Sequence, residues 1–113
     1  MKSMRLAHIV LIKPRDGATW RAEQIVDQLA ALATDLGAGE VYAGSDVSAE
    51  PFGGGYTLGV TMNFPAETVR DGYLRDARHG QLARELSLTA ESVLVVDLPI
   101  AAARSNDETE GRQ

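Results

Sequence analysis

Cysteine is absent from the 113 residues of this chain, and only two of its residues are histidines. The absence of cysteine excludes a disulfide scaffold, a thiolate metal site and a cysteine nucleophile. It also fits a protein of the reducing cytoplasm, which is where we expect this chain to be located. The two histidines and the scattered carboxylates form no motif such as H-x-x-x-H, so the sequence predicts no metal site.

Positive charge and long apolar runs are also scarce. The 16 acidic residues outnumber the 11 basic ones, and the net charge is −5. The chain therefore lacks the basic stripe through which proteins bind nucleic acid. No apolar run approaches the length of a membrane-spanning helix, and the short N-terminal run lacks the cleavage site of a signal peptide. We expect neither nucleic acid nor a membrane as a partner.

The composition that remains is that of an ordinary globular domain, with 44% hydrophobic and 24% charged residues. Four segments have the pattern of β-strands, namely residues 6–12, 40–46, 56–64 and 92–98. Three segments favour helices: one that Thr19 would cap and that carries Ile25, Leu29, Leu32 and Leu36 on one stripe, a second over residues 65–74, and a third over residues 77–86 that Asp76 would cap.

The order of these elements is β-α-β-β-α-β, which is the ferredoxin-like pattern. It predicts an α+β domain over residues 1–100, with one four-stranded antiparallel sheet and helices on one face only. Residues 101–113 are small and polar, and we interpret them as a disordered C-terminal tail. The three consecutive glycines at residues 53–55 lack the lysine and the helix that follow a phosphate-binding loop, and we predict no cofactor.

The first and last strands are apolar on both faces. In the first strand, for example, Val10 and Ile12 alternate with Ile9 and Leu11. Helices can cover only one face of the sheet, and a bare apolar face would be a large exposed patch. The simplest cover is a second copy of the chain, related by a two-fold axis. We therefore expect a homodimer through sheet faces, in which the two sheets form an α/β barrel.

Three stretches of the chain together resemble the stress-responsive A/B barrel (dimeric α/β barrel, Dabb) domain family: "HIVLIKPRDGATWRAEQI", "VYAGSDVSAEPFGGGYTLGVTMNF" and "YLRDARHGQLARELSLTAESVLVVDL". The marks of the family are a first strand that begins with histidine, a G-x-D/N-V-S turn, G-Y at the third strand, and Y-x-x-H-P-x-H before the last helix. The last segment reads Y-L-R-D-A-R-H here. Tyr73 and His79 match it, whereas Asp76 and Ala77 stand where the family has His-Pro.

The resemblance implies a ferredoxin-like homodimer without an organic cofactor. The family includes heat-stable stress proteins and plant polyketide cyclases, which fold a poly-β-ketone chain in a pocket between sheet and helices. Carried over by position, His8, Tyr73 and His79 match catalytic groups of that pocket. Leu58 occupies the place of a third-strand histidine, and residues 28–30 offer no tyrosine where the cyclases have one.

The three matching residues suit proton transfer on a small-molecule ligand. A neutral imidazole can remove or return a proton at pH 7, and a tyrosine hydroxyl can donate to a developing enolate. We predict that Tyr73 and His79 lie together at the mouth of a pocket and that His8 approaches from its floor. The predicted substrate contacts are Leu58, Val60, Met62, Val10 and Tyr56.

Each of these residues also has a structural interpretation. A histidine at the start of a strand often bonds to backbone, and a tyrosine at the edge of a core can keep its hydroxyl in water. Three hypotheses stay open: a cofactor-free cyclase, lyase or isomerase acting on an aromatic or polyketide-like metabolite, a non-catalytic stress-response protein, and a cofactor-free monooxygenase, the last by analogy of fold alone. A ligand-sized cavity that both histidines reach would favour the first over the second.

Overall fold

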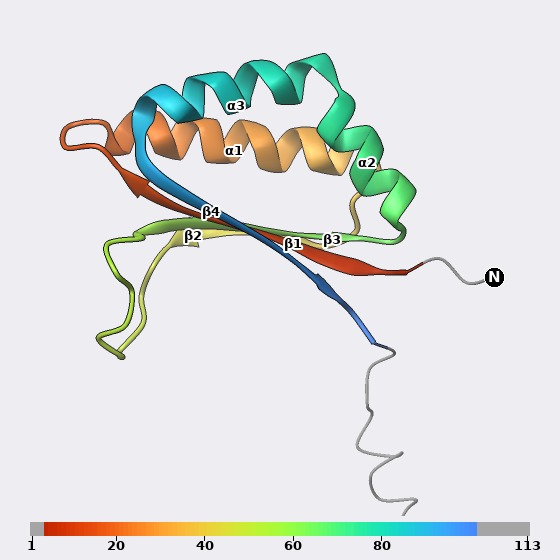
Figure 1. Cartoon of the computed structure of the whole chain (residues 1–113), viewed down its shortest axis with the longest axis horizontal. Coiled ribbons are helices and arrows are strands. Elements are labelled where there is room, and N and C mark those ends of the chain that lie inside the picture. Colours follow the sequence, from red (N-terminus) through yellow and green to blue (C-terminus); the bar gives the residue numbers. More distant parts are fainter. Residues whose placement is uncertain (1–3, 102–113) are drawn as a thin grey trace, which may run out of the picture.

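The computed structural model describes residues 4–101 and has two layers, a sheet and a set of helices that cover one of its faces (Figure 1). The elements are β1 (Leu6–Pro14), α1 (Thr19–Asp35), β2 (Val41–Ser45), β3 (Leu58–Phe64), α2 (Glu67–Arg75), α3 (Ala77–Thr89) and β4 (Ala90–Pro99). The strands form one antiparallel sheet in the order β2-β3-β1-β4. This is the predicted ferredoxin-like fold. The predicted tail, apart from Ala101, lies outside the described residues.

The alternation of side chains along β1 and β3 places a core beneath the helices. Successive residues of a strand point to opposite faces, and every second residue is buried from Leu6 to Ile12 and throughout β3. The stripe predicted for α1 belongs to the same cluster, although Leu36 is only partly buried. The buried members from these three elements include Leu6, Val10 and Ile12 of β1, Leu58, Val60, Met62 and Phe64 of β3, and Ile25, Leu29 and Leu32 of α1.

Of the two helix caps predicted from the sequence, the structure has one and lacks the other. The predicted Thr19 cap of α1 is wrong: Ala18 occupies the N-cap position, its carbonyl accepts from the Ala22 N–H at 3.0 Å, and no side chain caps this end. Asp76 caps α3 as predicted, because its carboxylate accepts from the backbone N–H of Arg78 at 2.8 Å. The extended backbone of Asp76 (φ −64°, ψ 135°) ends α2 and starts a new helix direction.

The second face of the sheet is uncovered in the single chain, since all three helices lie on the other side (Figure 1). Leu94, Val96 and Leu98 of β4 point to this face and are 45%, 47% and 50% exposed. Leu11 of β1, the cross-strand partner of Leu94, lies on the same face and is also exposed. These side chains form a contiguous apolar surface, which we call the open face.

We predict that Ile25→Ala lowers the free energy of unfolding by about 2–5 kcal/mol, the usual cost of truncating a fully buried aliphatic side chain. Ile25 lies on the inner side of α1 and is completely buried, whereas Leu88 on α3 is 78% exposed. Leu88→Ala should therefore change the free energy by no more than about 0.5 kcal/mol. Urea unfolding followed by circular dichroism measures both. Equal effects of the two substitutions would contradict this account of the core.

Candidate functional site

A cavity of about 310 Å³ lies between the helices and the β1–β4 half of the sheet. Its apolar walls include Val10, Leu29, Leu86 and Val93. Histidine and tyrosine side chains also line it, but no lysine, arginine, aspartate or glutamate of the described residues does. A cavity of this size and polarity is at the lower end of the range found for small-molecule sites.

His8, Tyr73 and His79 all line this cavity, although they come from three different elements. Tyr73 lies near the end of α2 and His79 in the first turn of α3, and the break at Asp76 folds one against the other. Their ring centroids are 4.7 Å apart in an edge-on arrangement. The centroid of the His8 ring, on β1, is 6.0 Å from that of Tyr73. The structure thus brings the three predicted residues together, with Tyr73 in contact with both histidines.

Polar atoms of the site open into the cavity. Among residues 4–101, no fully buried side-chain nitrogen or oxygen lacks a hydrogen-bond partner. In the same part of the chain, neither the Tyr73 hydroxyl nor Nε2 of His8 has such a partner. Both atoms must therefore retain some accessible surface, although Tyr73 as a whole is only 1% exposed. Both residues line the cavity, and we take this accessible surface to face it.

The local environment keeps Tyr73 and His79 uncharged at neutral pH. Burial raises the pKa of Tyr73 well above its ordinary value. Burial, and next the neighbouring His8, lower the pKa of His79, while the Leu74 carbonyl and the Asp76 carboxylate oppose this shift. At pH 7 the site therefore offers a protonated hydroxyl as a donor and a neutral imidazole as a proton acceptor.

The sequence analysis missed two charged residues beside the site. Nδ1 of His8 lies 2.7 Å from Oδ1 of Asp97, which is its cross-strand partner on β4. The other carboxylate oxygen of Asp97 accepts from Nη1 of Arg70, on α2, at 3.2 Å. An aspartate in the otherwise apolar last strand, paired antiparallel with the first, was the available signal. Its exact partner could not be assigned without the register of the two strands.

The predicted substrate contacts divide into two groups. Val10 lines the cavity, but Leu58, Val60, Met62 and Tyr56 do not. The first three of these are buried in the core, and the hydroxyl of Tyr56 is 2.7 Å from Oγ of Ser92. The reason is the strand order: β3 is separated from β4 by β1, and the cavity lies over β1 and β4. Leu58 therefore does not face the space that His8 faces.

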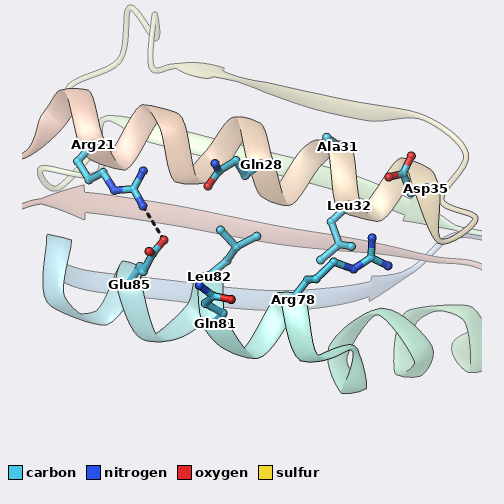
Figure 2. A pocket seen from close by; sticks show the side chains of 9 residues that line it. All are labelled: Arg21, Gln28, Ala31, Leu32, Asp35, Arg78, Gln81, Leu82 and Glu85. Carbon is cyan, nitrogen blue, oxygen red and sulfur yellow. Dashed lines mark hydrogen bonds and ion pairs between the residues drawn. The ribbon is translucent and has the colours of Figure 1, made fainter.

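A second hollow, of about 400 Å³, lies between α1 and α3 (Figure 2). Three of its charged side chains form ion pairs: Arg21 donates to Glu85 at 2.6 Å, and Arg78 pairs with Asp76 at 3.0 Å. It contains no histidine or tyrosine. Aspartate, glutamate and arginine side chains ordinarily keep one charge state near pH 7, whereas histidine ordinarily titrates there. We therefore take the histidine-lined cavity as the candidate site, although the hollow is larger.

No three histidine, aspartate or glutamate side chains within residues 4–101 are grouped so that they could hold a metal ion. No helix over the same range has the length and apolar character needed to cross a membrane.

Comparison with known proteins identifies relatives of the whole domain. The family model described as Stress responsive A/B Barrel Domain matches residues 6–100. No protein of curated function matches the chain. Among solved structures, a dimeric ferredoxin-like protein of unknown function from Jannaschia sp. CCS1 is 26% identical, with a TM-score of 0.77 over 85% of this chain and 99% of its own.

Two other solved structures share the fold at lower identity. A protein from Arabidopsis thaliana is 22% identical, with a TM-score of 0.75 over 88% of this chain and 99% of its own. A hydroxynitrile lyase from Passiflora edulis is 14% identical, with a TM-score of 0.73 over 89% of this chain and 97% of its own.

We predict that His79 titrates below its ordinary pKa of 6.5, because burial and His8 disfavour the imidazolium. Asp76→Asn should lower the pKa of His79 further, since it removes the carboxylate that favours the charged form, while asparagine still caps the helix. NMR titration of the histidine ring signals measures both values. Asp27→Asn on α1 is the control and should leave the titration unchanged.

The same shift has a consequence for stability. Because the pKa of His79 is lower in the folded chain than in the unfolded chain, the stability that neutral His79 gives to the fold is fully present above pH 6.5. This stability is lost as the pH falls through the pKa of His79 in the folded chain.

A pKa of His79 at or above 6.5, or one that Asp76→Asn does not lower, would contradict the electrostatic description of the site.

Proposed function

The chain belongs to the stress responsive A/B barrel domain family, and from this premise we propose that it binds a small, neutral, largely apolar metabolite in the histidine-lined cavity and transfers a proton on it without a cofactor. The observation that carries the proposal is the convergence of His8, Tyr73 and His79 on one apolar cavity. The chemical class of the metabolite is a ketone that carries an aromatic or polyketide-like body.

The proposed step is enolisation of the ketone. The neutral imidazole of His79 removes a proton from the carbon next to the carbonyl. The electron pair of that C–H bond forms the C=C bond of the enolate, and the π pair of the carbonyl moves to its oxygen. The Tyr73 hydroxyl donates a hydrogen bond to this oxygen as it becomes negative. The high pKa of Tyr73 keeps the hydroxyl protonated and able to donate. Return of the proton from the His79 imidazolium to another atom completes an isomerisation. In a cyclisation, the enolate carbon attacks a second carbonyl, and the alkoxide that forms takes the proton back from the imidazolium.

The uncharged lining supports the choice of a neutral ligand. No side chain of the cavity carries a fixed positive charge that could pair with a carboxylate or a phosphate. An anionic ligand would lose its hydration without gaining an ion pair, which is costly in an apolar site. A neutral aryl ketone makes apolar contacts with Val93 and Leu86 and needs only one polar contact, to the Tyr73 hydroxyl.

We further propose that the protein is a homodimer in which the open face of one copy packs on that of the other. The exposed leucine and valine side chains of β4 support this proposal, because a monomer would leave them in water. The relative from Jannaschia sp. CCS1, whose structure is described as dimeric, supports it as well. The cavity lies on the opposite side of the sheet, so the dimer would leave it accessible.

A second candidate function is a purely structural one, as in a stress-response protein without catalysis. The near-complete burial of Tyr73 and His8 favours it, because aromatic side chains in edge-on contact also stabilise a core. In that case the pKa of His79 would still be lowered by burial, but no ligand would exchange protons with the histidines.

We predict that the protein accelerates deuterium exchange at the carbon next to the carbonyl of an aryl alkyl ketone such as butyrophenone. In D₂O at pD near 7.5, His79→Ala should reduce the protein-dependent rate by about a hundredfold, the scale of a lost general base. Tyr73→Phe should reduce it at least about tenfold, because the enolate loses a donor. Proton NMR follows the loss of the signal.

Tyr42→Phe is the matched control, since Tyr42 lies on the opposite side of the sheet and bonds only with Glu40 among the described side chains. It should keep the wild-type rate. Exchange no faster than in buffer, or equal loss in Tyr42→Phe and Tyr73→Phe, would reject the catalytic proposal and favour the structural candidate.

The proposed dimer predicts different effects for substitutions on the two faces of β4. Val96 on the open face and Val95 on the cavity face are neighbours with similar exposure, 47% and 55%. Val96→Asp should convert the dimer to a monomer at micromolar concentration, because it would bury a charge between two apolar sheets. Val95→Asp should leave the dimer intact. Sedimentation velocity measures both, and a wild-type monomer or equal behaviour of the two variants would disprove the arrangement.

A further inference from the structure

We propose that Asp97 and Arg70 are positioning residues that fix His8 in one tautomer, with the proton on Nδ1 and a bare Nε2 directed at the cavity, so that the site selects ligands carrying a hydrogen-bond donor. The inference rests on the proposed function, because it takes the cavity to be a ligand site. It adds a preference for a hydrogen-bond donor on the ligand, which the shape and polarity of the cavity do not create by themselves.

The register of β1 and β4 creates the first link. His8 and Asp97 are directly paired across the two antiparallel strands, and directly opposed side chains point to the same face of a sheet. Oδ1 of Asp97 lies 2.7 Å from Nδ1 of His8. An ionised carboxylate can only accept a hydrogen bond, so Nδ1 must be the donor. A neutral imidazole has one N–H, and Nε2 is left as an acceptor.

Arg70 creates the second link. Its Nη1 donates to Oδ2 of Asp97 at 3.2 Å, and its Nε donates to Oδ1 of Asp71 at 2.9 Å. The guanidinium is planar and always charged, so two carboxylates held by it cannot rotate independently. The contact with Arg70 therefore leaves the other oxygen of Asp97 facing His8. Since Arg70 and Tyr73 share α2, the same contact ties the helix that carries Tyr73 to the strand that orients His8.

The burial of Arg70, Asp97 and His8 indicates that the contacts from Arg70 through Asp97 to His8 orient the His8 ring and do not only stabilise the fold. The Arg70 and Asp97 side chains are 20% and 33% exposed, and partly solvated ion pairs of this kind stabilise a fold only weakly. The His8 side chain is only 5% exposed. A buried ring cannot exchange its partner for water, and the carboxylate therefore determines which nitrogen carries the proton.

The chemical consequence concerns the ligand. With Nδ1 committed to Asp97, His8 offers the cavity an acceptor and no donor. A ligand that places a hydroxyl or an enol O–H against Nε2 gains a hydrogen bond, whereas its methyl ether gains none and leaves a nitrogen unpaired. The inferred ligand class is thus a neutral aromatic or enolic molecule that has at least one free hydroxyl group.

The test begins with the ring ¹⁵N shifts of histidine in the uniformly labelled protein at pH 8, where histidines are ordinarily neutral. The wild type should show His8 with a protonated Nδ1 and a bare Nε2. Asp97→Ala should remove this preference and favour the Nε2–H tautomer of free histidine. Arg70→Met, which keeps the aspartate, should leave a mixture of the two tautomers. Arg75→Met on the same helix is the matched control and should match the wild type.

The second part of the test compares the binding of 4-propylphenol with that of 4-propylanisole. Each is titrated into the protein while the ring ¹⁵N shifts are recorded. The phenol should bind the wild type at least about fivefold more tightly, the scale of one hydrogen bond, and this ratio should fall towards one in Asp97→Ala. If Asp97→Ala does not fold, Arg70→Met and the wild-type tautomer still decide the matter.

The outcomes separate this inference from the function on which it rests. A wild-type His8 with its proton on Nε2, or a tautomer that neither substitution changes, would overturn the positioning role even if the ketone exchange assay succeeds. The expected tautomers together with equal binding of phenol and anisole would overturn the ligand preference. Failure of ketone exchange, with tautomers and binding ratio as expected, would overturn the catalytic step and leave the binding inference in place.

Discussion

The antiparallel pairing of β1 with β4 is the constraint on which the rest of the molecule depends. It joins the first and last strands of the domain, with β4 at the edge of the sheet, His8 opposite Asp97 and Leu11 opposite Leu94. Because alternate residues point to opposite faces, a single register assigns the polar pair to the helix side and the leucines to the open face. A shift by one residue would exchange these faces and abolish both the cavity and the apolar surface at once.

Much of the fold could be predicted because its signals are local. The alternation along β3, the stripe of α1 and the cap at Asp76 each lie within a few residues of one another. The meeting of Tyr73 with His79 followed from the same break at Asp76. The Thr19 cap failed because a short turn before the helix places the carbonyl of Ala18, one residue earlier, at the first helical hydrogen bond.

The rest of the site depends on contacts between residues that are far apart in the sequence, and no local pattern predicts these contacts. Asp97 and His8 are far apart in the chain, and their contact requires the register between the first and last strands. Arg70 meets Asp97 only because α2 is placed over the end of β4. Leu58 was expected at the cavity because it stands where the family has a third-strand histidine, and Met62 because it lies on the same apolar side of the third strand as Leu58. They face the helices, but they do not line the cavity. The strand order puts β1 between β3 and β4, so that β3 lies under other parts of the helical layer.

The origin of the cavity lining in different elements has an evolutionary consequence. The groups proposed to handle protons come from β1 and from the junction of α2 with α3, whereas much of the apolar wall comes from the body of α3 and from β4. Mutations at wall positions such as Ala83, Leu86 or Val93 can change the size of the accepted molecule without displacing a proton-transferring group. A lineage with this arrangement can diversify its substrates by drift at a few aliphatic positions while its reactive centre stays under purifying selection.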